Sequence, residues 1–223
     1  TISVTEDTEK TITMEKAPES TRKDVSAAWK NFRNSDDNMG ITSAKTPTSE
    51  ETTYEKWFKK LGSGWGAAPS VQIIVDNSLI VMSANHIYKL DLNTGDILQT
   101  GDMVAATNFG YTPPTYADGM IFVPLADGRV QAFNAETLES LWVYQDMLKG
   151  QSLSPITYSD GYIYTGFWNA ETKDANYVCI PVTDEDPTNT QEAKEAAWQY
   201  TSLGGFYWAG SVVRGDYVVF GTD

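Results

Sequence analysis

Few side chains of this chain are suited to acid–base, nucleophilic or metal chemistry. Its 223 residues include one histidine, His86, and one cysteine, Cys179. One cysteine excludes an internal disulfide and a thiolate metal cluster, and one histidine excludes a histidine-rich metal site. Cys179 lies in the apolar run YVCIPV, where a lone cysteine behaves as a small buried hydrophobic residue, and His86 follows a turn whose hydrogen bonds an imidazole can serve. The sequence therefore predicts structural roles for both and no catalytic residue.

Two acidic clusters, at residues 36–38 and 184–186, supply the oxygen ligands that a hard cation prefers. Neither cluster has the alternate spacing and the glycine of an EF-hand loop. We interpret both as solvated loops, and the sequence predicts no metal site and no cofactor.

The charge of the chain limits the classes of partner. Acidic residues outnumber basic ones by 30 to 16, which gives a formal net charge of −14. No basic patch offsets this excess, so nucleic-acid binding is excluded. No apolar run reaches the roughly 18 residues of a membrane-spanning helix, so membrane insertion is excluded as well. We expect neutral or cationic partners.

The N-terminal part of the chain differs in composition from the rest. Residues 1 to about 56 are rich in Thr, Ser, Glu and Lys, whereas the remainder alternates short apolar runs with Gly, Asp and Asn turns. Residues 1–14 contain two short β-prone runs, and we interpret residues 1–26 as a linker or the end of an upstream β-domain. The chain starts at Thr1, and we expect any export signal to lie outside it.

Internal repeats indicate the architecture. Three segments of the form apolar run, turn pair, apolar run recur at a spacing of 42 residues, with the turn pairs Asp76-Asn77, Asp118-Gly119 and Asp160-Gly161. Both residues of such a pair tolerate a positive φ, which is the signature of a β-hairpin. A fourth copy carries Gly215-Asp216 in reversed order, after a polar insertion at residues 183–195. Stacked repeats of about 40 residues are typical of β-propellers.

A tryptophan closes the repeat at Trp57, Trp142 and Trp198. Four short antiparallel strands per repeat make a propeller blade, and the tryptophan lies in the fourth. We expect Trp142 and Trp198 to be buried in equivalent places of successive blades. In the repeat that contains the Asp76-Asn77 turn, residues 97–99 stand at the position of the closing tryptophan. We therefore expect the blade formed by that repeat to pack less well at its outer edge. Between residues 67 and 182 the period-two pattern leaves no room for a long helix. Residues 191–197 are the one segment that we expect to be helical.

The repeats resemble the quinoprotein-like family. In that family each blade has an Asp-Gly hairpin, then Asp-x-x-Thr-Gly and a closing tryptophan. The match is best in DLNTG at residues 91–95 and weaker in NAETL at residues 134–138, and the segment WKNFRNSDDNMGI at residues 29–41 resembles the start of such propellers. The resemblance implies an all-β fold, a β-propeller of four-stranded antiparallel blades, over residues 27–223.

The length predicts an incomplete ring. The repeats supply three blades and half of a fourth, whereas seven or eight blades need roughly 290 to 340 residues. The sequence therefore predicts a partial propeller. Its open ends expose strand edges and apolar blade faces, which associate with a second chain or are completed by residues outside this one.

One set of aromatic residues recurs just before, or in the loops next to, the innermost strands. In a propeller such positions meet at one rim of the central channel. If the chain has a ligand site, we expect it on the rim formed by Trp65, Tyr111, Trp168, Tyr207 and Trp208. The alternative is that these rings wedge between blades as core.

Two classes of function remain open from the sequence. The first is a non-enzymatic binding or scaffold module of an exported, cell-surface protein, with a protein or carbohydrate ligand bound on the channel face. A variant of it is an assembly scaffold similar to the propeller lipoprotein of outer-membrane biogenesis. The second is a quinoprotein-type dehydrogenase, or another enzyme, whose site lies on blades outside this chain. The resemblance implies calcium and adjacent cysteines for a quinone site, but Cys179 stands alone, which favours the first class.

Overall fold

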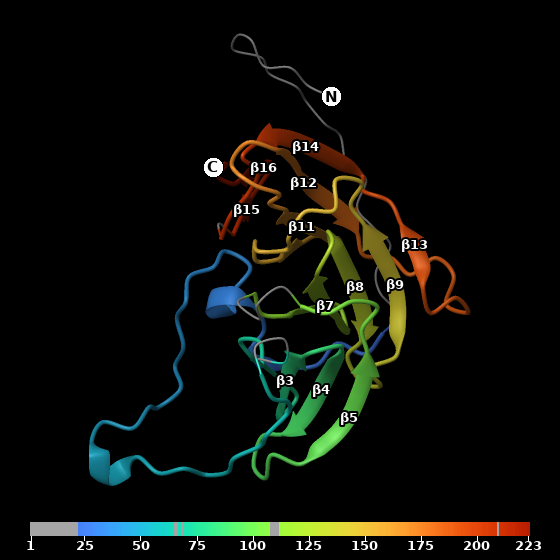
Figure 1. Ribbon diagram of the computed structural model, residues 1–223. Helices are drawn as coiled ribbons and strands as arrows, with labels where there is room; N and C mark the ends of the chain where they lie inside the picture. The colour runs from blue at the N-terminus through green and yellow to red at the C-terminus, as the bar shows by residue number, and fades with distance from the viewer. Residues whose placement is uncertain (1–21, 65–66, 68, 108–111, 209) are drawn as a thin grey trace.

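The computed structural model describes residues 22–64, 67, 69–107, 112–208 and 210–223, and these residues are almost entirely β-strand and loop (Figure 1). Two short 3-10 helices, η1 (Phe32–Asn34) and η2 (Glu50–Thr52), and a 3-10 conformation at Ala67 make up the helical structure of the described residues. The prediction of an all-β chain is confirmed. Among the described residues, no helix is both long and apolar enough to cross a bilayer.

The strands form three antiparallel blades and a two-stranded half-blade. Blade I consists of β2 (Ile73–Val75), β3 (Ser78–Ser83), β4 (His86–Asp91) and β5 (Ile97–Asp102), and β1 (Ala27–Trp29) joins it beside β2. Blade II consists of β6 (Thr115–Ala117), β7 (Met120–Leu125), β8 (Arg129–Asn134) and β9 (Ser140–Gln145), and β13 (Glu192–Lys194) joins it beside β9. Blade III consists of β10 (Thr157–Ser159), β11 (Tyr162–Gly166), β12 (Asp174–Pro181) and β14 (Trp198–Leu203). The half-blade consists of β15 (Val212–Arg214) and β16 (Tyr217–Val219).

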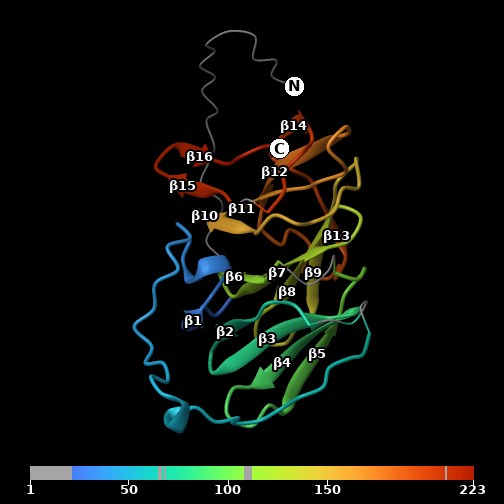
Figure 2. The same cartoon turned by 60° about the vertical axis from the view of Figure 1, so that its left-hand side comes forward.

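The inner strands of successive units contact one another in the order β2, β6, β10, β15. Figure 2 shows these strands on one side of the molecule, with the outer strands of the blades on the other. This is the radial arrangement of a β-propeller, and the described residues form an arc of it rather than a closed ring. The prediction of a partial propeller is confirmed.

The hairpin turns lie where the repeat predicts them. Each turn pair follows the inner strand directly, so that Val75 pairs with Ser78 and Ala117 with Met120. All six turn residues have a positive φ, between 46° and 80°. Two successive positive φ values are the geometry of the type I′ hairpin turn, which Asp, Asn and Gly adopt at low cost.

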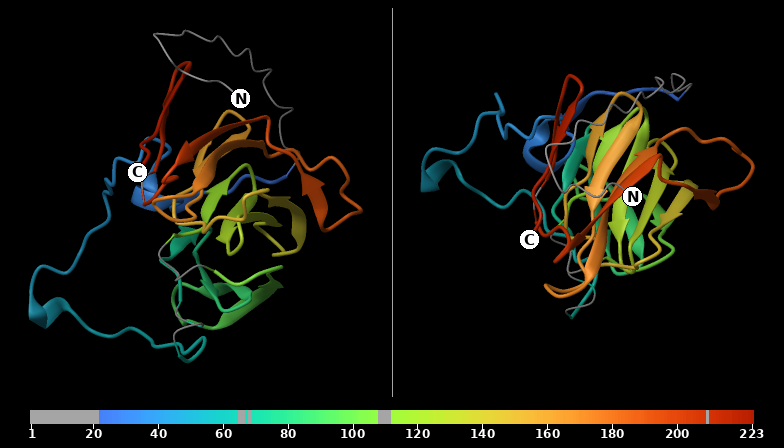
Figure 3. Two further views of the ribbon diagram at one scale, coloured as in Figure 1. Left: turned by 45° about the horizontal axis from the view of Figure 1, so that its top comes forward. Right: turned by 90° about the horizontal axis from the view of Figure 1, so that it is seen from above.

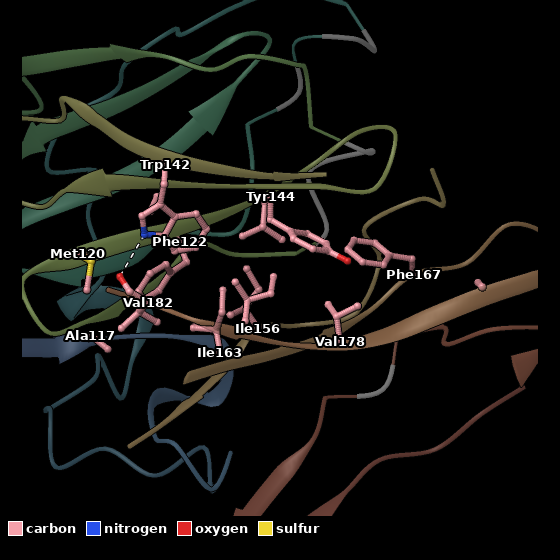
Figure 4. Close-up of a cluster of buried hydrophobic side chains, with 14 residues drawn as sticks. Ala117, Met120, Phe122, Trp142, Tyr144, Ile156, Ile163, Phe167, Val178 and Val182 are labelled. Atoms are coloured by element: carbon pink, nitrogen blue, oxygen red, sulfur yellow. Dashed lines mark hydrogen bonds between the residues drawn. The ribbon is translucent and has the colours of Figure 1, made fainter. Parts of the chain in front are cut away.

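The core lies between blades rather than within them. One cluster joins blades I and II, and another joins blades II and III around Trp142 and Phe122 (Figure 4). A third cluster packs Tyr177 and Phe206 of the blade III region against the half-blade. Each blade therefore depends on its neighbours for the burial of its apolar faces, as expected for a repeat protein.

Closing tryptophans dock on the following blade. The Trp142 indole Nε1–H donates to the Val182 carbonyl of blade III at 3.1 Å, and Trp57 donates to the Leu92 carbonyl of blade I at 3.1 Å. Trp57 lies in a coil rather than in a strand. A Cβ added at Gly95 would come within 2.5 Å of the Trp57 ring, which explains the glycine of that turn.

Blade I lacks this tryptophan, and blade II lacks the matching glycine. Leu138 stands in place of the glycine and has a left-handed φ of 57°, although its side chain is buried. In β5, Ile97 and Leu98 are exposed by 44% and 52%, in agreement with the looser outer edge expected for this blade.

Two expectations from the sequence are wrong in detail. Residues 191–197 form no helix, because Glu192–Lys194 is strand β13, which pairs in parallel with β9. Trp142 and Trp198 both lie in the outer strands of successive blades, but only Trp142 is fully buried. The half-blade beyond blade III contributes two strands, so Trp198 is left half-covered.

The N-terminal segment runs along the inner strands. Ala27 pairs with Val75 in blade I, the Tyr116 hydroxyl of blade II donates to Asp24, and the Asn38 amide donates to the Ser211 carbonyl near the half-blade. A coil between residues 41 and 61 then extends away from the blades (Figure 3). The inner edge of blade I is thus paired, whereas Tyr217 and Val219 of the half-blade are exposed by 75% and 67%.

Candidate functional site

The loops at the two ends of the blades differ in charge. The connections from each outer strand to the next inner strand span residues 103–114, 146–156 and 204–211. Asp146 and Lys149 are the only charged residues in these three connections, whereas the β7–β8 and β11–β12 turns at the same end carry Asp127, Glu171 and Lys173. At the opposite end, the hairpin and strand-to-strand turns carry Asp76, Asp91, Asp96, Asp118, Glu136, Glu139 and Asp160. These three connections, which together with the adjoining Trp168 we call the neutral face, are therefore poor in charged residues.

An aromatic stack lies on the neutral face. The rings of Trp168 and Tyr207 are 5.0 Å apart, and those of Tyr207 and Trp208 are 4.4 Å apart at an interplanar angle of 17°. Trp168 follows β11, whereas the other two residues lie between β14 and β15. The structure thus brings together three of the five residues expected at the rim. Trp65 and Tyr111 lie outside the described residues.

Backbone contacts hold this stack in place. Trp168 exchanges two backbone hydrogen bonds with Gln151, at 2.7 and 3.0 Å, and the Phe206 N–H donates to the Phe167 carbonyl at 3.0 Å. Gly205 has a φ of 72°, and a Cβ there would come within 2.8 Å of the Phe167 carbonyl oxygen. Loops of blades II and III are therefore fixed to each other at the point where the rings meet.

Two loop residues of the neutral face are conformationally strained. Trp208 has a φ of 56° and Lys149 a φ of 54°, the left-handed region that side chains with a Cβ seldom occupy. Such a residue costs on the order of 1 to 3 kcal/mol, and strain of this kind is concentrated at functional sites. The strained Trp208 is nevertheless 58% exposed, so burial of its ring does not explain the conformation.

Apolar residues that the sequence analysis missed lie beside the stack. Met147 and Leu148 are exposed by 85% and 41%. The Asn169 amide, next to Trp168 in the chain, donates to the Leu148 carbonyl at 3.1 Å and to the Asp174 carbonyl at 2.9 Å. In the sequence, these two residues are an apolar pair in the loop after the fourth strand of a blade. Comparison of the repeats does not distinguish such a pair from other loop residues.

A buried polar network supports these loops. Asp146 is fully buried, and its carboxylate accepts hydrogen bonds from the Asn176 amide at 2.8 Å, the Leu148 N–H at 3.0 Å and the Tyr144 hydroxyl at 3.4 Å. Thr201 donates to the Asn176 amide oxygen at 2.6 Å. Burial, with the Asp146 charge beside it, raises the pKa of Tyr144 above its ordinary value. The network therefore joins the outer strands of blades II and III to the loop of Met147 and Leu148.

One polar atom of the stack has no hydrogen-bond partner among the described residues. The indole Nε1 of Trp168 is buried, and nothing accepts its hydrogen. Buried donors are nearly always paired, by protein, water or a ligand. An acceptor group that enters the neutral face at this ring would satisfy it.

The residues first considered for chemistry have structural environments. Cys179 is fully buried in β12, and burial raises the pKa of its thiol to about 12. The prediction of a small buried hydrophobic residue is confirmed. The His86 Nδ1 lies 2.9 Å from the Asp102 carboxylate at the β4–β5 edge. Among the described residues, no three His, Cys, Asp or Glu side chains are grouped so as to hold a metal ion.

Burial of Cys179 predicts its reactivity. We expect native protein to react with DTNB at pH 8 more slowly than urea-unfolded protein by about a hundredfold or more, because labelling has to pass through an opened blade. The thiol is protonated at that pH because its pKa is about 12. Stopped-flow absorbance of the released thiolate measures both rates, and rapid labelling of the native protein would contradict the buried position.

A known family matches the repeats. The family model described as "Outer membrane protein assembly factor BamB" matches residues 48–169, which is more than half of the chain. The chain belongs to this family of PQQ-like repeat proteins. The resemblance to quinoprotein-like repeats found in the sequence is thereby confirmed. No curated protein sequence matches the chain.

Solved structures with PQQ-like and other repeats are similar to the chain in fold. The computationally designed Ika8 protein has a TM-score of 0.51 and 14% identity, over 70% of this chain and 43% of that one. A quinohemoprotein alcohol dehydrogenase from Pseudomonas putida HK5 has a TM-score of 0.48 and 19% identity, over 59% of this chain and 20% of that one. BamB from Moraxella catarrhalis has a TM-score of 0.37 and 16% identity, over 58% of this chain and 47% of that one. The chain thus spans less than half of each of these three proteins.

Proposed function

We propose that this chain is part of a non-enzymatic scaffold of the cell envelope or cell surface, and that a protein partner docks on the neutral face. The observation that carries the proposal is the exposed, strained Trp208, whose ring stacks on Tyr207, which in turn contacts Trp168. These rings lie in or beside connections whose only charged residues are Asp146 and Lys149. Large aromatic side chains in such surroundings are the residues that contribute most to protein interfaces.

The neighbours of the stack suit a protein partner. Met147 and Leu148 extend the apolar surface next to the rings, and methionine adapts its shape to the side chains that it meets. The unpaired Trp168 Nε1 would be satisfied by a peptide carbonyl. The family's description as an assembly factor of outer membrane proteins supports both a protein partner and a location outside the cytoplasm.

The ionisable groups of these loops favour binding over chemistry. Asp146 is buried, and its carboxylate oxygens are used by Asn176, Leu148 and Tyr144. It therefore holds the loops rather than reaching a ligand. A general acid or base needs direct access to the proton that it transfers.

We further propose that residues 27–223 form one domain and that residues 1–26 link it to the preceding part of the protein. Within the described residues, Arg22 contacts Asp184 and Tyr116 contacts Asp24, so the last part of this linker runs against the propeller. The exposed strands of the half-blade would be completed by further chain or by a second protein.

The test is binding of the full-length protein to peptide and glycan arrays. We expect the Trp208→Ala variant to bind its peptide ligand at least about tenfold more weakly, a difference of about 1.4 kcal/mol. Tyr54→Ala is the control, because Tyr54 is 80% exposed in the coil far along the chain from the neutral face. If the parent binds a glycan instead of a peptide and Trp208→Ala loses that binding, the partner is a carbohydrate rather than a protein.

Two outcomes would contradict the proposal. Binding that survives in both Trp208→Ala and Trp168→Ala would move the site away from this face. A calcium-requiring, quinone-dependent reduction of a dye by the full-length protein would show an enzyme instead of a scaffold.

A further inference from the structure

Among the described residues, no strand pairs with the outer edge of blade I, and this edge is only partly guarded. β5 is the last strand of its sheet, and residues 97–101 include no charge and no proline, although Asp102 ends the strand and a register shift interrupts it at Leu98. Ile97 and Leu98 are exposed by 44% and 52%. Edge strands of natural proteins are normally covered or guarded by charges or proline, because their unpaired backbone groups attract another strand.

The equivalent edge of blade II is already occupied by an added strand. The insertion in blade III supplies β13, which pairs in parallel with β9 through Glu192 with Trp142, Ala193 with Val143 and Lys194 with Tyr144. Figure 1 shows β13 on the outer side of β9 and no strand on the outer side of β5. The chain thus demonstrates that the outer edge of one of its blades accepts a parallel strand.

The register shows which backbone groups of β5 face outward. The Met103 N–H donates to the Asn85 carbonyl at 2.9 Å, across the end of the β4–β5 pair. In an antiparallel pair the inward and outward groups alternate, so the N–H groups of residues 101 and 99 face β4. Thr100, opposite Tyr88 and with an exposed side chain, therefore turns its N–H and C=O away from the sheet.

We propose that β5 binds an extended, cationic segment of a partner protein by strand addition, in the manner of β13 on β9. The backbone of Thr100 pairs with the segment, and Ile97 and Leu98 contact its apolar side chains. Asp96 and Asp102 lie at the two ends of the edge, and the Asp102 side chain is 91% exposed, so basic residues are favoured. The net charge of −14 adds a longer-range attraction. This edge is separate from the neutral face.

A peptide of alternating lysine and valine tests the proposal. Labelled with a fluorophore, it is titrated with the protein at low salt, and anisotropy reports binding. We expect Thr100→Pro, which removes one outward N–H, to weaken binding at least tenfold. Thr100→Val keeps the N–H and a β-branched side chain, and we expect it to bind as the parent does. Leu98→Lys, which adds a guarding charge, is expected to weaken binding as well.

Peptide controls separate strand addition from simple charge attraction. The same peptide with N-methyl groups on alternate residues keeps its charge but cannot pair, and we expect it to bind at least tenfold more weakly. Equal binding of the two peptides, or of the Thr100→Pro and Thr100→Val variants, would overturn the proposal. Trp208→Ala is expected to leave this binding unchanged, so failure here is distinguishable from failure of the proposed neutral-face function.

Discussion

Replacing Trp142 by alanine is expected to lower the free energy of unfolding by about 3 to 5 kcal/mol, the range for deleting a large core aromatic. The ring is fully buried between blades II and III, lies 5.8 Å from the Phe122 ring, and donates a hydrogen bond to the Val182 carbonyl (Figure 4). Its loss would leave both a cavity and an unpaired carbonyl at the same blade interface. Urea denaturation followed by circular dichroism measures the change.

The matched comparison is Trp198→Ala. Trp198 occupies the same strand of the following blade and contacts Tyr164 and Tyr177, but it is only half-buried. We expect a loss of about 1 to 2 kcal/mol, in proportion to the apolar area that it buries. Equal losses of unfolding free energy in the two variants would mean that another segment covers Trp198. A urea midpoint for Trp142→Ala equal to that of the parent would contradict the blade assignment.

Replacing Asp146 by alanine is expected to cost about 3 kcal/mol. The substitution leaves the Asn176 amide, the Leu148 N–H and the Tyr144 hydroxyl without their acceptor in a buried place. A buried polar group left unpaired costs roughly 1 to 3 kcal/mol, and rearrangement of the loop recovers part of the sum. Because Leu148 and Met147 are held by this carboxylate, we also expect weaker ligand binding at the neutral face.

Asp127→Asn is the control for this experiment, because asparagine tolerates the left-handed φ of 59° at this position. Asp127 lies in the neighbouring β7–β8 turn, where its side chain is 65% exposed and forms a 3.3 Å ion pair with Arg129. Exposed pairs of this kind contribute less than about 1 kcal/mol. Urea midpoints of both variants, measured beside ligand affinity, separate the two roles of Asp146. A stability for Asp146→Ala equal to that for Asp127→Asn would show that the network contributes nothing.

The architecture of this protein was readable from its sequence because the decisive signals are local and repeated. The turn pairs at 42-residue intervals select a hairpin geometry through φ alone, and all of them occur as predicted. Alternation of apolar residues between these turns then determines which face of each strand is buried. The same repetition placed Tyr207 and Trp208 in a loop of one face, and the structure brings Trp168 against them.

Other features depend on contacts between segments that are distant in the chain, and only the tertiary structure decided them. Residues 192–194 form a strand because β9 presents an unpaired edge to them, although their own sequence favours a helix. β1 forms against β2 across more than 40 residues of intervening chain. Leu148 is joined to the loop of Trp168 only because blade II meets blade III there, through the Asn169 amide. Local sequence sets the conformation of turns and strands, whereas pairing at an edge depends on which backbone groups the rest of the fold leaves unbonded.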